Sequence, residues 1–180
     1  SGKDQKIYSD LGLSAQPFEN VRYYYPYSKD KITANVQSYA HPDDVKMQIK
    51  AGKAKKYKFT YEKCIEKIDL LLANEDDSSG TLESCVNYII NRQEPFNSVD
   101  SWPTLLEKID ECTKTEANGG KKNEIMVTSW RKFKRCVKKA IQSNIFISNL
   151  NEENGEIDLT DEISNNLTNG QVMVIDIARL

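Results

Sequence analysis

The sequence predicts an α+β protein in which a block of four helices is flanked by short strands. Between residues 60 and 142, apolar residues recur with helical spacing in four separate segments. A segment rich in strand-forming residues, 20–27, precedes this block, and a continuous apolar run, 171–177, follows it. We therefore divide the chain into an N-terminal strand and basic loop region, a helical domain, and a C-terminal strand-helix-strand segment: 1–59, 60–144 and 145–180.

The composition narrows the classes of protein to consider. A chain of 180 residues is long enough for one domain with a core, or for one domain that carries an insertion. The charged fraction of 29% predicts a strongly solvated surface, and the net charge of -2 excludes a globally basic nucleic-acid binder but not local basic patches. We find no apolar run of membrane-spanning length and no secretion signal, so we expect a cytoplasmic protein without membrane contact.

The region before the helical domain contains one strand and few periodic signals. Lys3–Asp10 is a candidate for a short helix. The segment 20–27 is rich in tyrosine, and Pro26, which cannot donate a ladder hydrogen bond, limits the strand. We expect mostly loop in 28–45, followed by a basic stretch that extends to Phe59.

Each of the four expected helices carries one apolar stripe at i, i+3 and i+4 spacing. Thr60 is a candidate N-cap for the first helix and Ser101 for the third, where Pro103 is tolerated in the first turn. The fourth helix extends from about Ser129 to Gln142. The stripes are Tyr61, Cys64, Ile65, Ile68, Leu71 and Leu72; Leu82, Cys85, Val86, Ile89 and Ile90; Trp102, Leu105, Leu106, Ile109 and Cys112; and Trp130, Phe133, Val137 and Ile141.

The C-terminal segment changes character. Ile145–Ile147 is short and apolar, and Asp161–Leu167 is a candidate for a short helix. The run Gln171–Ile177 is mainly apolar, which is typical of a strand that is buried on both faces of a parallel sheet. Such a strand needs neighbours, so we interpret the strands on both sides of the helical block as parts of one interrupted sheet.

The four cysteines favour a structural role. Each falls on the apolar stripe of an expected helix, and no two have the C-x-x-C spacing of a metal or redox pair. We interpret them as buried free thiols in a reducing compartment. Their even number leaves a disulfide framework as the alternative.

Catalytic motifs are not recognisable in the sequence. It has neither the phosphate-binding pattern G-x-x-x-x-G-K-[ST] nor the dinucleotide pattern G-x-G-x-x-G. His41 is the only histidine, so a histidine-rich metal site cannot form, and we interpret it as a solvated or turn-capping residue. Paired carboxylates lie in turns or at helix starts, where such residues are common. We expect no catalytic residue, metal or cofactor in this chain.

Asp176 differs from the other carboxylates because it interrupts the last apolar run near its C-terminal end. In open α/β sheets, the carboxyl ends of strands line the ligand crevice. Asp176 is therefore a candidate strand-end site. The alternative is a hydrogen bond from the end of this strand to a neighbouring loop.

Two segments are candidates for contact with a polyanion. Lys46–Phe59 contains six lysines and no acid, with Tyr57 and Phe59 interleaved, and the fourth helix carries six basic residues. Basic groups release counterions from a phosphate backbone, and aromatic rings can stack on bases. The alternative is that both faces are solvated and neutralised by acidic helices. The phosphate contacts that we predict are Lys53, Lys55, Lys56, Lys58, Arg131, Arg135 and Lys138.

The segments FENVRYYYPYS (18–28) and EIDLTDEISNNLTNGQVMVIDIARL (156–180) resemble parts of HerA/FtsK-like ATP-binding proteins, which are DNA-pumping ATPases of bacteria and archaea. The two segments together cover 36 of the 180 residues. It implies a RecA-like α/β ATPase core, assembled as a ring, in which the helical block is an insertion. The nucleotide-binding motifs of that family are missing from the chain, so ATP and Mg²⁺ would belong to the parent protein and no catalytic residue carries over.

These observations lead to one functional hypothesis and one competitor. The hypothesis is a non-catalytic helical insertion domain of an ATP-dependent DNA translocase or helicase-like ATPase, which guides DNA through its basic faces. The chain would then be an interior segment whose partners are DNA and the rest of the parent protein. The competitor is a protein–protein interaction module without a nucleic-acid role. Salt dependence separates them, because phosphate contacts weaken steeply with salt.

Overall fold

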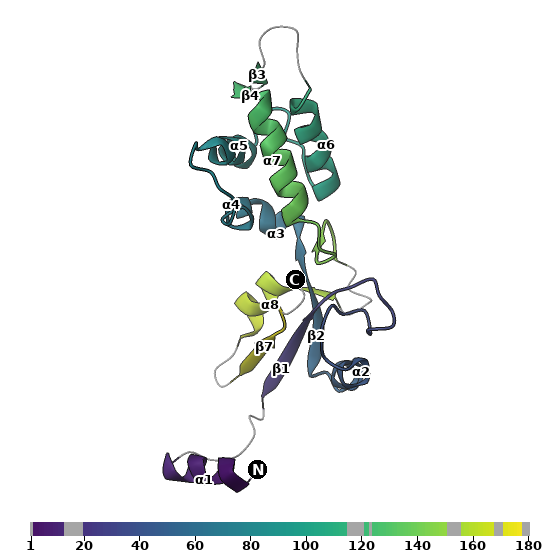
Figure 1. The fold of residues 1–180 in the computed structure, drawn as a ribbon. Helices are drawn as coiled ribbons and strands as arrows, with labels where there is room; N and C mark the ends of the chain where they lie inside the picture. The colour runs from purple at the N-terminus through teal and green to yellow at the C-terminus, as the bar shows by residue number, and fades with distance from the viewer. Residues whose placement is uncertain are drawn as a thin grey trace.

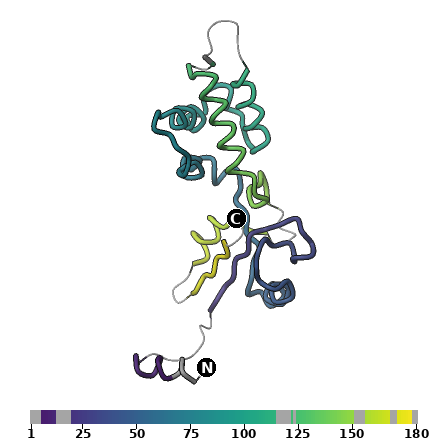
Figure 2. Tube along the Cα trace, viewed as in Figure 1, coloured from purple at the N-terminus to yellow at the C-terminus, as the bar shows by residue number. Residues whose placement is uncertain are grey.

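The computed structural model describes residues 2–12, 20–114, 121–122, 124–150, 156–167 and 171–177. In this part of the chain, a parallel β-sheet with helices forms one unit and a group of helices forms a second unit above it (Figure 1). The chain leaves the sheet, builds the helical unit and then returns to the sheet (Figure 2). The helical unit is therefore an insertion between two strands of one sheet.

Among the described residues the sheet contains five strands, and all of the pairings between them are parallel. Its strands are β1 (Val21–Pro26), β2 (Ala54–Thr60), β5 (Phe146–Ile147), β6 (Glu156–Asp158) and β7 (Val172–Ile175). β1 lies between β2 and β7. The other edge of β2 pairs first with β6 and then, further along the strand, with β5. β2 is thus the strand from which the chain enters the helical unit, and β5 is the strand at which it returns.

Two helices cover opposite faces of the sheet: α2 (Pro42–Lys50) and α8 (Leu159–Asn166). Neighbouring residues of a strand point to opposite faces, and β1 follows this rule with consecutive tyrosines. Tyr25 packs in a cluster with Val45 of α2, whereas Tyr24 packs in a cluster with Leu159 of α8. The tyrosine-rich segment is therefore a strand that is buried on both faces.

The helical unit surrounds α7, which lies between α5 and α6 (Figure 1). Its elements are α3 (Tyr61–Ile65), α4 (Ile68–Leu71), α5 (Thr81–Ile90), α6 (Trp102–Cys112), α7 (Val127–Ala140) and a ribbon of β3 (Lys121–Lys122) and β4 (Ile125–Met126). Trp130 of α7 is completely buried, stacks on Phe96 at 5.6 Å between ring centroids, and donates from Nε1 to the carbonyl of Lys122 at 2.9 Å. The unit thus has its own core.

The expected fold class is wrong. The protein is an α/β protein with a parallel sheet covered on both faces, and not a four-helix block flanked by short strands. The error lies in 28–59, which was expected to be loop and basic stretch but contains α2 and β2. Three lysines in the seven residues of β2 hide its strand character, because charged residues normally indicate a solvated segment. Two of those lysines are neutralised by acids that lie about a hundred residues later in the chain.

Two further expectations need correction. The first expected helix is divided into α3 and α4, because Lys67 leaves the helical conformation with φ -119° and ψ 26°. The last strand, β7, is not buried on both faces: Val174 and Ile175 are 41% and 37% exposed. Within the described residues β7 pairs with β1 alone, so it forms an edge of the sheet.

Other expectations are confirmed. α1 (Gly2–Asp10) covers the candidate helix at the N-terminus, and α5, α6 and α7 follow the predicted stripes. Ser101 accepts a hydrogen bond from the backbone of Thr104 and thus caps α6. All four cysteines are buried free thiols. In the described residues, we find no helix with the length and apolar character needed to cross a membrane.

Candidate nucleic-acid interface

α7 is the most basic element of the helical unit. Its sequence, VTSWRKFKRCVKKA, contains six basic residues and no acid. The helix forms because the apolar residues Val127, Trp130, Phe133 and Val137 recur at three- and four-residue spacing and are all buried. The basic residues therefore occupy the sides and outer face of a helix whose inner face is fixed by the core.

Three of the six cations are tied to acids of neighbouring segments. Lys132 lies 3.6 Å from the Asp77 carboxylate, and Lys139 lies 2.7 Å from Glu75. Lys134 forms an ion pair with Asp110 of α6. These pairs join α7 to the turn before α5 and to α6, so their first role is to hold the helical unit together.

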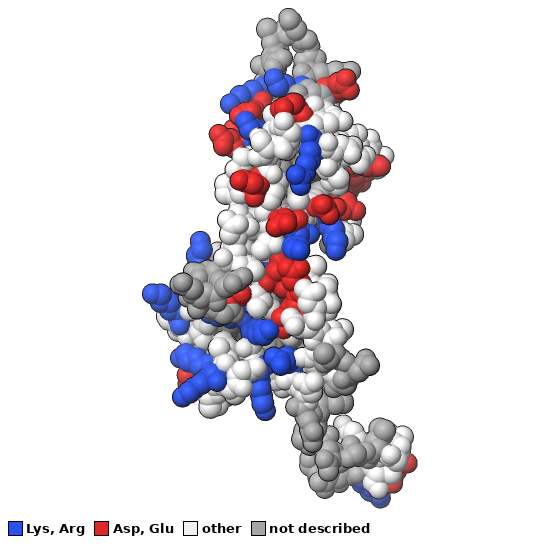
Figure 3. All heavy atoms as spheres, turned by 180° about the vertical axis from the view of Figure 1, so that it is seen from behind, with Lys and Arg blue, Asp and Glu red and all other residues white. Residues whose placement is uncertain are grey.

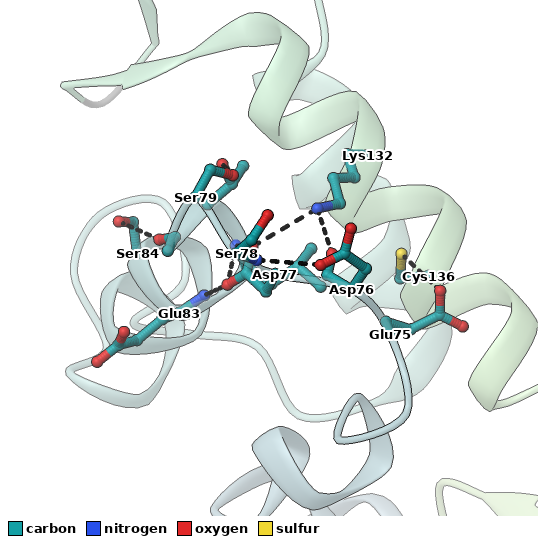
Figure 4. Close-up of polar contacts among 12 residues, drawn as sticks. Glu75, Asp76, Asp77, Ser78, Ser79, Glu83, Ser84, Lys132 and Cys136 are labelled. Atoms are coloured by element: carbon teal, nitrogen blue, oxygen red, sulfur yellow. Dashed lines mark hydrogen bonds and ion pairs between the residues drawn. The ribbon is translucent and has the colours of Figure 1, made fainter.

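The acidic turn before α5 is shown in Figure 4, where Lys132 reaches toward Asp76 and Asp77. The Asp77 carboxylate accepts hydrogen bonds from the backbone N–H groups of Leu82 at 2.9 Å and Glu83 at 3.0 Å, and so caps α5. Partial burial opposes ionisation of Asp77, but these hydrogen bonds and the Lys132 charge outweigh it and lower the pKa of the carboxyl. The turn is an intramolecular partner for the cations on one side of α7.

The other three cations face a groove between α6 and α7. Arg131, Arg135 and Lys138 are exposed and line a groove of about 690 Å³ whose apolar floor includes Leu106 and Ile141. Arg131 donates from Nε to the carbonyl of Thr113, at the end of α6. Neither Arg135 nor Lys138 makes an ion pair within the part of the chain that the structure describes. These three were among the predicted phosphate contacts, and the fold brings them together.

The lysines of β2 have a different environment. Lys55 donates to both oxygens of the Glu162 carboxylate at 2.8 and 2.9 Å, and Tyr24 donates to the same group at 2.9 Å. Lys58 is buried, lies 2.6 Å from the Glu156 carboxylate, and sits 3.7 Å from the centre of a tyrosine ring. The ammonium groups of Lys55 and Lys58 are therefore paired with carboxylates of the α/β unit, and Lys58 is buried whereas the Lys55 side chain is 33% exposed.

Lys53 and Lys56 remain on the surface of the α/β unit. Lys53 is exposed in the turn after α2, and Lys56 is half-buried beside a polar pocket that also contains Glu156 and Glu162. Lys and Arg side chains gather on the α2 side of this unit, at the lower left of Figure 3. The seven predicted contacts thus separate into three groups: a groove on α7, a set in β2 that is paired with carboxylates, and a surface set near α2.

Asp176 lies at the end of β7 and contacts a loop. The hydroxyl of Ser38 donates to its carboxylate, and its backbone N–H donates to the carbonyl of Tyr24 at 2.9 Å. The Tyr57 hydroxyl donates to the Asp176 carbonyl at 2.9 Å, and burial raises the pKa of that phenol to about 12. This geometry corresponds to the alternative interpretation, a hydrogen bond from the strand end to a neighbouring loop.

His41 has a local structural contact. Its Nδ1 accepts a hydrogen bond from the backbone of Asp43 at 3.3 Å, which caps the start of α2. This is the turn-capping role that was interpreted from the sequence. Among the described residues, no group of three or more His, Cys, Asp and Glu side chains is arranged to hold a metal ion.

The sequence reasoning missed the acidic partners and the floor of the groove. Leu106 was assigned to the core stripe of α6, but it is only half-buried and lines the groove. The acidic run Glu75–Asp77 was interpreted as a turn, and its role in neutralising one side of α7 was not predicted. The three consecutive acids of this run were the feature of the sequence that could have indicated this role.

No protein-family model matches this chain, and a search of curated proteins finds no match. The similarity to HerA/FtsK-like proteins therefore stays a prediction from two segments of the sequence.

Proposed function

We propose that this protein is a non-catalytic element of a larger ATP-dependent DNA translocase or helicase-like ATPase, and that the groove between α6 and α7 contacts DNA phosphates. The observation that carries the proposal is the division of cations on α7. Lys132, Lys134 and Lys139 are used to hold the fold, whereas Arg135 and Lys138 face the groove without an ion pair in the described residues.

The spacing of the groove cations supports a linear polyanion. Arg131, Arg135 and Lys138 stand at i, i+4 and i+7, which places them along one side of the helix. Seven residues of α-helix rise about 10 Å, and one strand of duplex DNA advances that far in about three phosphates. A row of three cations over this length matches a row of three phosphates.

The position of the helical unit is also compatible with an insertion in a larger α/β machine. The unit leaves the sheet after Thr60, at the carboxyl end of β2, which is the edge where α/β proteins bind their ligands. The end of α7 lies against the same edge, because Lys139 and Ala140 line a pocket together with Phe59 and Phe146. DNA in the groove would therefore lie close to the carboxyl edge of the sheet.

The experiment is a comparison of two charge-matched triple variants. Arg131→Glu, Arg135→Glu and Lys138→Glu reverse the groove, and Lys29→Glu, Lys31→Glu and Lys67→Glu reverse exposed lysines elsewhere. Each triple variant lowers the net charge from -2 to -8, because each substitution removes two positive charges. Binding to a labelled DNA duplex is measured by fluorescence anisotropy at low salt.

We expect the groove variant to lose duplex affinity by about tenfold or more, because three phosphate contacts are replaced by repulsion. The control variant should bind within about threefold of the wild type, because long-range effects of net charge are partly screened. Equal affinity of the groove variant and the control variant would contradict the proposal. Circular dichroism and urea unfolding of both variants show that each is folded.

The competing function is a protein-interaction module, and one observation favours it. The floor of the groove is apolar at Leu106 and Ile141, as in grooves that accept an amphipathic segment of another protein. The Leu106→Ser substitution would strongly lower the affinity for such a partner but would leave phosphate contacts almost unchanged. Duplex affinity that neither Leu106→Ser nor the groove charge variant changes would favour this competing function.

A further inference from the structure

We infer that the groove contacts the sugar–phosphate backbone alone and does not stack on bases, so that it accepts duplex and single-stranded DNA without regard to sequence. This inference rests on the proposed function. It assigns to the groove one class of ligand, a linear phosphodiester chain, and it excludes base recognition by this surface.

The positions of the aromatic side chains indicate that the groove does not stack on bases. Proteins that hold single strands through their bases present exposed aromatic rings beside a basic groove. In the described part of the helical unit, the exposed large apolar side chains are Leu70, Ile90 and Met126, none of which is aromatic. The aromatic residues of α7, Trp130 and Phe133, are completely buried in the core. They are therefore inaccessible to a base in the groove.

The chemistry of the groove lining favours phosphates over bases as the ligand. Of the eight lining residues in the described chain, five are basic, two are aliphatic and one is an amide, Gln142. In the major groove an amide can read adenine and an arginine can read guanine. The lining, however, offers one amide, just beyond α7, and its two arginines stand in one row with Lys138 at a spacing that fits phosphates. Cations in a row fit phosphates, which repeat regularly and carry no sequence information.

Several cations that line the groove are held by contacts within the protein. Lys134 is held by Asp110 and Lys139 by Glu75, so the two sides of the groove are set by intramolecular ion pairs. Arg131 is oriented by its hydrogen bond to the carbonyl of Thr113. The helix therefore sets the spacing of the cationic row before DNA binds, and the Arg131 side chain is already held in place.

The test uses three labelled probes with equal numbers of phosphates: a duplex, a single strand of mixed sequence, and a single strand of abasic deoxyribose-phosphate units. Affinities of the wild-type chain are measured by fluorescence anisotropy at low salt. The dissociation constants of the two single strands should agree within about threefold, whereas one stacked base alone contributes roughly fivefold to a hundredfold. The Gln142→Ala variant should show the same pattern as the wild type.

The outcomes separate this inference from the proposed function. If the abasic strand binds as tightly as the mixed strand, and the variant with Arg131→Glu, Arg135→Glu and Lys138→Glu loses both, the inference is supported. If DNA binds but the abasic strand is weaker by tenfold or more, the inference is overturned while the proposed function stands. If none of the probes binds at low salt, the proposed function fails, and the inference fails with it.

Discussion

β2 and α7 are both rich in basic residues, and they use their charges in opposite ways. Neither contains an acid, and each has nearly half of its residues basic. In β2, side chains alternate between two faces, and Lys55 and Lys58 enter opposite sides of the sheet, where Glu162 and Glu156 neutralise them. In α7, the helical period keeps the cations away from the apolar face, and five of the six line an open groove.

The comparison teaches that local charge density does not identify a binding surface. What decides is the position of acids that are distant in sequence. Glu156 lies 98 residues after Lys58, and Glu162 lies 107 residues after Lys55. For α7, the acidic turn and α6 supply acids to one side and to the groove edge, but Arg135 and Lys138 are left without an ion pair in the described residues.

The largest loss of stability should follow from breaking the buried ion pair between Lys58 of β2 and Glu156 of β6. Glu156→Gln leaves the Lys58 ammonium buried without its counter-charge, which costs about 3–5 kcal/mol of unfolding free energy. Urea unfolding monitored by circular dichroism measures this change. The double variant with Lys58→Met should recover much of the loss, because the buried charge is then removed as well. A loss below about 1 kcal/mol in Glu156→Gln would show that the pair is not buried as described.

A smaller effect is expected at Asp158, which joins β2, β6 and α8. Its carboxylate caps α8 by accepting from the Thr160 backbone at 2.9 Å, and it also accepts from the backbone and hydroxyl of Thr60 at 2.8 Å. Asp158→Ala removes the cap and leaves donors unsatisfied, so we expect a loss of about 1–3 kcal/mol in unfolding free energy. Asp158→Asn should lose less, because the amide oxygen can still accept. Equal losses in the two variants would argue against the capping role.

The pH dependence of stability should show the contribution of the ionised Glu162 carboxylate. Burial opposes its ionisation, but hydrogen bonds from Lys55, Tyr24 and Asn166 and the Lys55 charge outweigh burial and lower the pKa of the carboxyl. A lowered folded-state pKa means that the stabilisation is present above the unfolded-state value, about 4.3, and is lost as pH falls through the folded-state pKa. The stability difference between wild type and Glu162→Gln should therefore be largest near neutral pH and should narrow in acid. A difference that grows in acid would contradict this assignment.

The smallest effect on stability is expected at the groove itself. Arg135→Ala and Lys138→Ala remove exposed side chains that make no ion pair in the described residues, so unfolding free energy should change by less than about 0.5 kcal/mol. Duplex affinity should nevertheless fall in each variant. This pattern is the opposite of that expected for the buried lysine of β2. A stability loss comparable to that of Glu156→Gln would mean that the groove cations are structural.

The sequence predicted the elements whose patterns are local. The stripes of α5, α6 and α7 could be read because apolar residues face one core at helical spacing. The tyrosines of β1 and the apolar run of β7 were identified as strands from their local composition. α2, β2 and β6 were missed, and the α/β class with them, because a strand with lysines at three of seven positions depends on partners that no local pattern reveals.

The residues of the candidate site divide in the same way, into those that a local pattern predicted and those that depend on distant partners. Arg131, Arg135 and Lys138 were predicted from the basic face of one helix, and the structure places them in one groove. Lys55 and Lys58 were predicted by the same rule, but their acids come from the other end of the chain. The groove also needs α6 for its floor, and helix packing of this kind cannot be derived from the spacing of residues within α7.

The most direct test of the central claim, that α7 contacts phosphates through three groove cations, is the salt dependence of duplex binding. The logarithm of the association constant is plotted against the logarithm of salt concentration for the wild-type chain. Three phosphate contacts predict a slope of about -2.7. The Lys29→Glu, Lys31→Glu and Lys67→Glu control should give the same slope. A slope near zero for the wild type, with measurable binding, would contradict the phosphate-contact account.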